Sequence, residues 1–101
     1  MQLPRNDIEK SLPTKGFVKE ETHHTYFYHE YEGKRTGAYT YTSRGTTYKT
    51  YGVQLIARMK VELKLDKNGD VFDLCSCPMS GQDYNEILRR KGMIPTADEA
   101  K

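Results

Sequence analysis

The chain has 101 residues, of which 30% are charged and 36% hydrophobic, and its formal net charge is +2. This length predicts one domain over residues 1–101, with an ordered core at 5–94 and a tail at 95–101. No stretch approaches the roughly 18 apolar residues of a membrane-spanning helix, and the first residues contain no apolar signal segment. Two cysteines are too few for a disulfide framework. We therefore expect a cytoplasmic protein without a membrane partner.

The first predicted element is a short helix. Ile8 and Leu12 are four residues apart and therefore share one helical face. Asn6 is the expected N-cap, and Gly16 marks the exit from the helix.

Three strands are predicted next, because the residues that follow are mainly β-branched or aromatic. Their expected bounds are 17–21, about 24–31 and 36–42. The glycine at Gly33 predicts a turn that joins the second and third strands as a hairpin.

The second half of the chain predicts helices. Apolar residues at helical spacing indicate a helix over about 51–65, which a turn at 66–70 ends. The segment 71–74 is compatible with either a helical turn or a short strand. Ser80, with an aspartate three residues later, begins a last helix that ends before Gly92.

This order predicts an α+β fold: a three-stranded antiparallel sheet with helices on one face, in the order α-β-β-β-α plus an extra C-terminal helix. Three strands cannot hide both faces of their sheet, so the other face is expected to meet solvent. A flat, polar ligand would bind there.

Charge is distributed unevenly along the chain. The segment 33–61 contains no acidic residue, although the chain has 14 in total. Its basic residues are Lys34, Arg35, Arg44, Lys49, Arg58 and Lys60. Its tyrosines are Tyr39, Tyr41, Tyr48 and Tyr51. Cations and phenol rings together suit a phosphate-rich ligand. The alternative is a solvated face whose counter-charges come from elsewhere in the fold.

The pair His23-His24 is the strongest candidate for chemistry. Adjacent residues of a strand point to opposite faces, so His24 would share a face with Tyr26 and Tyr28, and His23 would share the more apolar face with Phe27. This interpretation places His24 on the open face, although a register error of one residue would exchange the two histidines. Histidine has a reference pKa near 6.5 and can both accept and donate a proton at neutral pH. The alternative is a surface histidine without a function.

Other known sites are not predicted. Cys75 and Cys77 lack the spacing of a zinc knuckle, and no second cysteine pair follows them. We interpret them as small, partly buried thiols. The sequence also lacks a phosphate-binding glycine loop and a G-x-S-x-G motif.

Several short motifs, taken in their order and spacing, resemble HicA-type toxins and most closely a HicA-like branch found in archaea and bacteria. The matching residues are Ile8 to Leu12, Gly16 to Lys19, His24, Tyr26, Gly33 to Thr36, Ser43 to Gly45, Leu55, Met59-Lys60, Leu63 to Leu65, Leu74 to Pro78, Ile87-Leu88 and Lys91-Gly92. Thr22 and His23 stand where the family has Gly and Ser or Asp, and Arg44 stands where the branch often has His.

The resemblance implies a fold like that of double-stranded-RNA-binding domains (dsRBD-like). It also implies a ribosome-independent mRNA endoribonuclease that is inhibited by a HicB-type antitoxin. By position, His24 matches the catalytic histidine of the family. Cleavage by the 2′-hydroxyl of the RNA needs no metal or cofactor, and we expect none.

The sequence therefore predicts catalysis by His24. The predicted RNA-binding residues are Tyr26, Lys34, Arg35, Tyr41, Arg44 and Lys49. Two alternatives stay open. One is a non-catalytic RNA-binding module of the same fold, and the other is a protein-interaction domain that uses the tyrosine-rich face.

Overall fold

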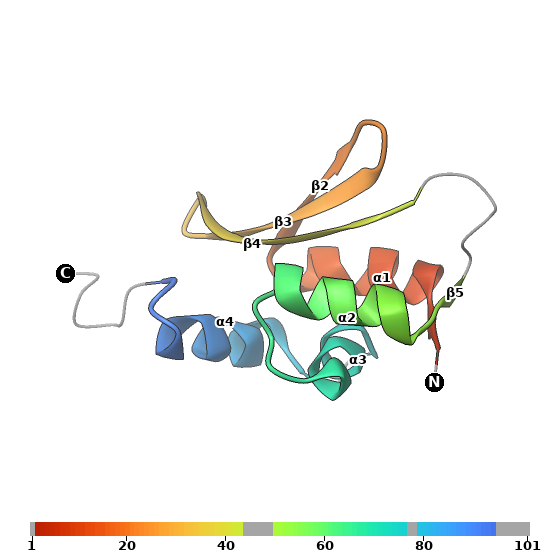
Figure 1. The fold of residues 1–101 in the computed structure, drawn as a ribbon. Helices are drawn as coiled ribbons and strands as arrows, with labels where there is room; N and C mark the ends of the chain where they lie inside the picture. Colours follow the sequence, from red (N-terminus) through yellow and green to blue (C-terminus); the bar gives the residue numbers. More distant parts are fainter. Residues whose placement is uncertain (1, 44–49, 77–78, 95–101) are drawn as a thin grey trace.

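The computed structural model describes residues 2–43, 50–76 and 79–94. Within these ranges, four α-helices lie on one side of a three-stranded antiparallel sheet, and two short strands form a second sheet (Figure 1). The elements in chain order are β1 (Leu3–Pro4), α1 (Arg5–Ser11), the 3-10 helix η1 (Leu12–Lys15), β2 (Phe17–Glu21), β3 (Thr25–Tyr31), β4 (Lys34–Thr42), β5 (Thr50–Tyr51), α2 (Val53–Glu62), α3 (Asn68–Ser76) and α4 (Gly81–Arg90). The predicted α+β class and antiparallel sheet are confirmed, and α3 is an additional helix.

β3 is the central strand and pairs with β2 on one side and β4 on the other. The turn between β3 and β4 consists of Glu32 and Gly33, whose φ angles are 52° and 80°. Two positive φ angles are typical of a type I′ turn, whose twist matches that of the flanking strands. Because this turn takes only two residues, β4 begins at Lys34, two residues earlier than predicted.

β4 contains a bulge opposite His29. Tyr28 pairs with Tyr39 and Glu30 pairs with Arg35, so the three residues of β4 at 36–38 oppose a single residue of β3. Gly37, at the centre of the bulge, has a φ of 97°, which a side chain would strain.

The two faces of the sheet differ in burial. Along β3, Phe27 and His29 are buried against the helices, whereas Tyr26 and Tyr28, which alternate with them, are half-buried on the other face. The alternation predicted for this strand is confirmed. The helical side contributes most of the core, which includes Ile8, Leu12, Ile56, Met59, Leu63, Val71, Leu74, Tyr84 and Leu88.

The pairing of β1 with β5 was not predicted. Leu3 lies opposite Tyr51, and both side chains are buried. The Tyr51 hydroxyl accepts a hydrogen bond from the Ser43 N–H at 2.8 Å, and Arg5 Nη1 donates to the Ser43 carbonyl at 2.8 Å. Tyr51 is therefore part of the core, and its predicted place on a phosphate-binding surface is wrong.

α1 begins earlier than predicted. Its N-cap is Pro4 rather than Asn6, because Pro4 still pairs with Thr50 and the helix starts directly after this strand. The predicted exit is confirmed: Gly16 has a φ of 94° at the end of η1.

α2 is shorter than the predicted helix over 51–65. It begins after the extended Gly52, because Tyr51 belongs to β5. It ends at Glu62, and Lys64 takes a left-handed φ of 60° that is incompatible with a continuing helix.

α3 resolves the ambiguous segment 71–74 as helix and starts inside the predicted turn at 66–70. Its last turn is held by side chains from the N-terminal part of the chain. Ser11 Oγ donates to the Cys75 carbonyl at 2.6 Å, and the buried Lys15 Nζ donates to the Leu74 carbonyl at 2.5 Å. The lysine charge also suits the negative end of the helix dipole.

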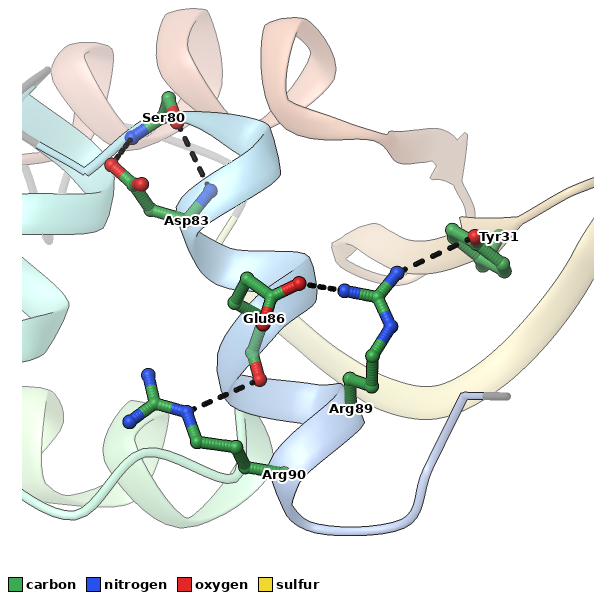
Figure 2. A network of polar contacts seen from close by, with 6 residues as sticks. All are labelled: Tyr31, Ser80, Asp83, Glu86, Arg89 and Arg90. Atoms are coloured by element: carbon green, nitrogen blue, oxygen red, sulfur yellow. Dashed lines mark hydrogen bonds and ion pairs between the residues drawn. The ribbon is translucent and has the colours of Figure 1, made fainter. Parts of the chain in front are cut away.

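α4 begins with a capping box, as predicted. Asp83 N–H donates to Ser80 Oγ at 3.0 Å, and Ser80 N–H donates to Asp83 Oδ2 at 3.1 Å (Figure 2). At the other end of α4, Arg89 pairs with Glu86 and donates to the Tyr31 hydroxyl at 3.5 Å. The contact between Arg89 and Tyr31 joins α4 to the sheet.

Replacing Ser80 with alanine is expected to lower the free energy of unfolding by about 1 kcal/mol, because the helix loses its side-chain N-cap. Urea denaturation followed by circular dichroism measures this change. Gln82→Ala, at an exposed position in the same turn, is the control and is expected to change stability by less than about 0.5 kcal/mol. Equal effects of the two substitutions would contradict this role of the capping box.

None of the helices in the described residues has the length and apolar character needed to cross a membrane.

Candidate nucleic-acid interface

The sheet face that points away from the helices is rich in aromatic side chains. We define the open face as the residues of the three strands that point to this side, together with His24. Its residues are Val18, Glu20, His24, Tyr26, Tyr28, Glu30, Arg35, Tyr39 and Tyr41. The helices of the described residues cover only the opposite face, as predicted (Figure 1).

The tyrosines of the open face form one continuous group. Tyr26 and Tyr28 stack with ring centroids 5.7 Å apart and an interplanar angle of 12°. Tyr28 also stacks with Tyr39 at 6.3 Å, and Tyr26 lies 5.4 Å from Tyr41. Tyr26 and Tyr41 were predicted site residues, and the structure brings them together. Tyr28 and Tyr39 were not among those residues, although the alternation of β3 and β4 places all four tyrosines on one face.

His24 lies at one end of this group. It belongs to the turn between β2 and β3, where Thr22 N–H donates to the His24 carbonyl at 2.9 Å. The prediction that it is a strand residue is therefore wrong. Its ring nevertheless contacts the predicted neighbours, with centroids 4.9 Å from Tyr41 and 6.1 Å from Tyr26.

The two nitrogens of His24 differ in access. Nδ1 is shielded from solvent and has no hydrogen-bond partner among the described residues, whereas Nε2 is not shielded in this way. Nε2 is therefore the atom through which His24 can exchange a proton with a bound molecule.

The other two histidines lie elsewhere. His23 is exposed in the same turn and not on the apolar face, because β3 starts only at Thr25. His29 is buried on the helical side, and its nitrogens each lie 3.0 Å from an oxygen, Nδ1 from Thr36 Oγ1 and Nε2 from Asn85 Oδ1. Burial lowers the pKa of His29 below its ordinary value of 6.5, and the hydrogen bond with Asn85 partly opposes this shift. His29 is therefore a neutral core residue at pH 7.

Arg35 crosses the open face. Its guanidinium carbon lies 4.0 Å from the centroid of the Tyr28 ring, and its Nη2 pairs with Glu20 Oε2 at 3.0 Å. In the strand register, Arg35 lies opposite Glu30 and Glu20 lies opposite Tyr26. The Arg35 side chain therefore reaches diagonally across β3, from β4 to β2. Arg35, which was predicted to bind RNA, lies on the open face, but the Glu20 carboxylate already balances its charge.

Arg58 was not predicted as a site residue. It lies on α2 and reaches the edge strand β4, where Nη2 donates to the Tyr41 carbonyl at 2.8 Å and the guanidinium carbon lies 4.1 Å from the Tyr41 ring centroid. Its Nε pairs with Glu62 Oε1 at 3.4 Å. No local sequence pattern predicts that a residue of a helix will contact the edge strand of a sheet.

Glu62 affects its surroundings electrostatically. Burial raises the pKa of Glu62, while the hydrogen bond from Thr40 and the charge of Arg58 oppose this shift. The Glu62 charge in turn raises the pKa of Tyr39. Since this pKa lies above the ordinary value of 10.0, the Tyr39 phenol is protonated at neutral pH and can donate a hydrogen bond.

The remaining predicted cations are placed differently. Lys34 is exposed at the start of β4, next to the hairpin turn. It lines a depression together with Tyr31, Thr36 and Met93, away from His24. Arg44 and Lys49 lie outside the described residues.

The described residues contain no cluster of three or more side chains that could hold a metal ion. Cys75 is a buried free thiol, and burial raises its pKa to about 12. A thiol with this pKa is protonated and unreactive at neutral pH.

The open face thus combines aromatic rings, an accessible imidazole nitrogen and the Arg35 guanidinium, and the Arg58 guanidinium of α2 reaches its edge at Tyr41; both guanidinium groups have carboxylate partners. Within the described part of the segment 33–61, Arg35 and Arg58 have counter-charges from outside that segment. The counter-charges of these two residues therefore come from elsewhere in the fold, as the alternative interpretation of the basic segment expects.

No protein-family model, curated protein or solved structure matches the chain.

Proposed function

We propose that this protein is a HicA-like, dsRBD-like endoribonuclease that binds mRNA on the open face and cleaves it with the help of His24. The position of His24 carries the proposal: an imidazole with an accessible Nε2 lies at the end of a tyrosine surface. The resemblance of the sequence to HicA-type toxins supports it. Such a protein would act in the cytoplasm, where a HicB-type antitoxin would be its inhibitor.

The proposed reaction is attack of an RNA 2′-hydroxyl on the adjacent phosphorus. His24 Nε2 accepts the hydroxyl proton while a bond forms between O2′ and phosphorus. The bond between phosphorus and O5′ breaks, and O5′ takes a proton from water. The products are a 2′,3′-cyclic phosphate and a 5′-hydroxyl end. Arg35, at the other end of the tyrosine group, would hold the RNA backbone away from the reacting phosphate.

The experiment that tests this proposal is incubation of the purified protein with a long single-stranded RNA in the presence of EDTA. We expect fragments that carry 2′,3′-cyclic phosphate and 5′-hydroxyl ends on a denaturing gel. Fragments with 3′-hydroxyl and 5′-phosphate ends, or no fragments at all, would overturn the proposed cleavage.

A non-catalytic RNA-binding module is the second candidate, and one observation favours it. In the described part of the open face, His24 is the only histidine, so no second imidazole supplies a proton to the leaving oxygen. This candidate predicts intact RNA together with measurable affinity. Log affinity should fall with log salt concentration with a slope of about −0.7 per phosphate contact. Intact RNA without affinity would instead favour a protein-interaction domain.

A further inference from the structure

The tyrosines of the open face offer a ligand two kinds of contact, the faces of their rings and their hydroxyl groups. Bases of single-stranded RNA stack on free aromatic ring faces. Phosphate oxygens only accept hydrogen bonds, which phenol hydroxyls can donate. The two kinds of contact therefore lead to two kinds of RNA recognition.

The ring faces of Tyr28 and Tyr41 are already in contact with other side chains. Arg35 lies over Tyr28 at 4.0 Å, and Tyr26 stacks on the same ring. Arg58 lies over Tyr41 at 4.1 Å, and the His24 ring lies 4.9 Å from it. Both arginines make further contacts, Arg35 with Glu20 in an exposed ion pair and Arg58 with the Tyr41 carbonyl. A base could stack on Tyr28 or Tyr41 only by displacing these groups.

The hydroxyl groups, by contrast, have no hydrogen-bond partners in the described part of the chain. Among the described residues, none of the hydroxyls of Tyr26, Tyr28, Tyr39 and Tyr41 makes a hydrogen bond, and none is shielded from solvent. Tyr31, on the helical side of the same sheet, differs because its hydroxyl accepts from Arg89. The open face therefore presents four tyrosine hydroxyls that can donate to a ligand, on rings that contact one another.

The guanidinium groups add donors of the same kind. A guanidinium has five N–H groups, and the Arg35 contact with Glu20 uses one nitrogen. The remaining N–H groups can donate to phosphate without breaking this ion pair. Hydroxyl and guanidinium donors together suit a polyanion better than they suit neutral bases.

We infer that the open face binds the sugar–phosphate backbone of RNA through the tyrosine hydroxyls, and that it does not bind the bases by stacking. This inference rests on the proposed function and specifies its mode of recognition. Contacts to phosphate carry no sequence information, so the protein binds single-stranded RNA with little preference for base sequence.

The test uses fluorescence anisotropy with two labelled oligomers of equal length, both 2′-O-methylated so that they resist cleavage. One carries uracil at each position, and the other carries no bases. The variant Tyr28→Phe/Tyr41→Phe removes two hydroxyls and keeps the aromatic rings. The variant Tyr28→Leu/Tyr41→Leu removes the hydroxyls and the rings. Tyr31→Phe is the matched control, because it removes a hydroxyl from the other face.

We expect wild type to bind both oligomers with similar affinity, within about threefold. The Phe variant should lose roughly a hundredfold in affinity, since it removes two hydroxyls and each lost hydrogen bond to a charged group typically costs about tenfold. The Leu variant should lose no more than the Phe variant, and the Tyr31→Phe control should bind as wild type does.

Two outcomes would overturn the inference, and they differ in what they imply for the proposed function. If wild type binds only the oligomer with bases and the Phe variant keeps its affinity, the bases stack and the proposed function stands. If wild type binds neither oligomer, the proposed function fails as well.

Discussion

Replacing His24 with alanine is expected to slow RNA cleavage by about 10²- to 10⁴-fold, which is the usual contribution of a general acid or base. The side chain contributes little to folding, because it lies in a turn and its contacts are with half-buried rings of the open face. The variant should therefore keep its melting temperature to within a few degrees. RNA affinity should also be kept, since the tyrosines and Arg35 of the open face are unchanged.

The control for this experiment is His23→Ala. His23 is the adjacent residue in the same turn and is exposed. Its replacement changes the turn to the same degree but leaves the ring beside Tyr41 in place. Cleavage by His23→Ala should match that of wild type, measured as the initial rate of fragment formation. Equal cleavage by wild type and His24→Ala, or loss of cleavage in His23→Ala alone, would reject the assignment of His24.

The second large effect is expected for His29, on stability rather than on chemistry. This side chain links the sheet to α4, because its two nitrogens contact Thr36 in β4 and Asn85 in α4. The ring also packs edge-on against Phe17 and Tyr84, with centroids 5.0 Å from each. His29→Leu would keep the packing volume but leave Asn85 Oδ1 without its partner and remove one of the hydrogen bonds of Thr36 Oγ1. We expect a loss of about 2–4 kcal/mol in the free energy of unfolding.

Acid should destabilise wild type through the same residue. The folded pKa of His29 lies below the 6.5 of the unfolded chain, so the unfolded state binds the proton more readily. The contribution of His29 to the free energy of unfolding is therefore fully present above about pH 6.5. It is lost as pH falls below this value, by at most about 1.4 kcal/mol per pH unit. Glu62, whose pKa is raised, has the opposite effect on stability, because its protonation at lower pH favours the folded state.

Urea denaturation of wild type and His29→Leu at several pH values between 5 and 8 separates these effects. The difference in unfolding free energy between the two proteins should shrink as pH falls, since only wild type loses the His29 contribution. His23→Leu is the matched control for an exposed histidine and should stay within about 0.5 kcal/mol of wild type. A difference that is constant across this pH range would show that His29 is not a buried neutral group.

The features that could be predicted from the sequence have local causes. The alternation of aromatic residues in β3 identifies the buried and open faces, because side chains of a strand alternate. Gly33 identifies the hairpin turn, and the spacing of Ser80 and Asp83 identifies the start of α4. The same alternation of side chains predicts that Tyr26 and Tyr41 lie together on the open face.

The features that could not be predicted depend on residues far apart in the chain. The segment 71–74 is too short for its apolar pattern to distinguish helix from strand, and part of what stabilises it as helix is the contact of Ser11 and Lys15 with its last turn. The ion pair between Arg35 and Glu20 joins the two outer strands of the sheet. Only the register shows that Glu20 is close enough to balance this charge.

The pairing of Leu3 with Tyr51 implies an order for the folding reaction. The two hairpins of the central sheet join strands that are neighbours in the chain, whereas β1 and β5 are separated by almost half of it. Closing a longer loop costs more chain entropy before any contact compensates for it. We therefore expect both hairpins to form early and the β1–β5 pair to form late. The N-terminal strand would then close a sheet and core that are already largely assembled.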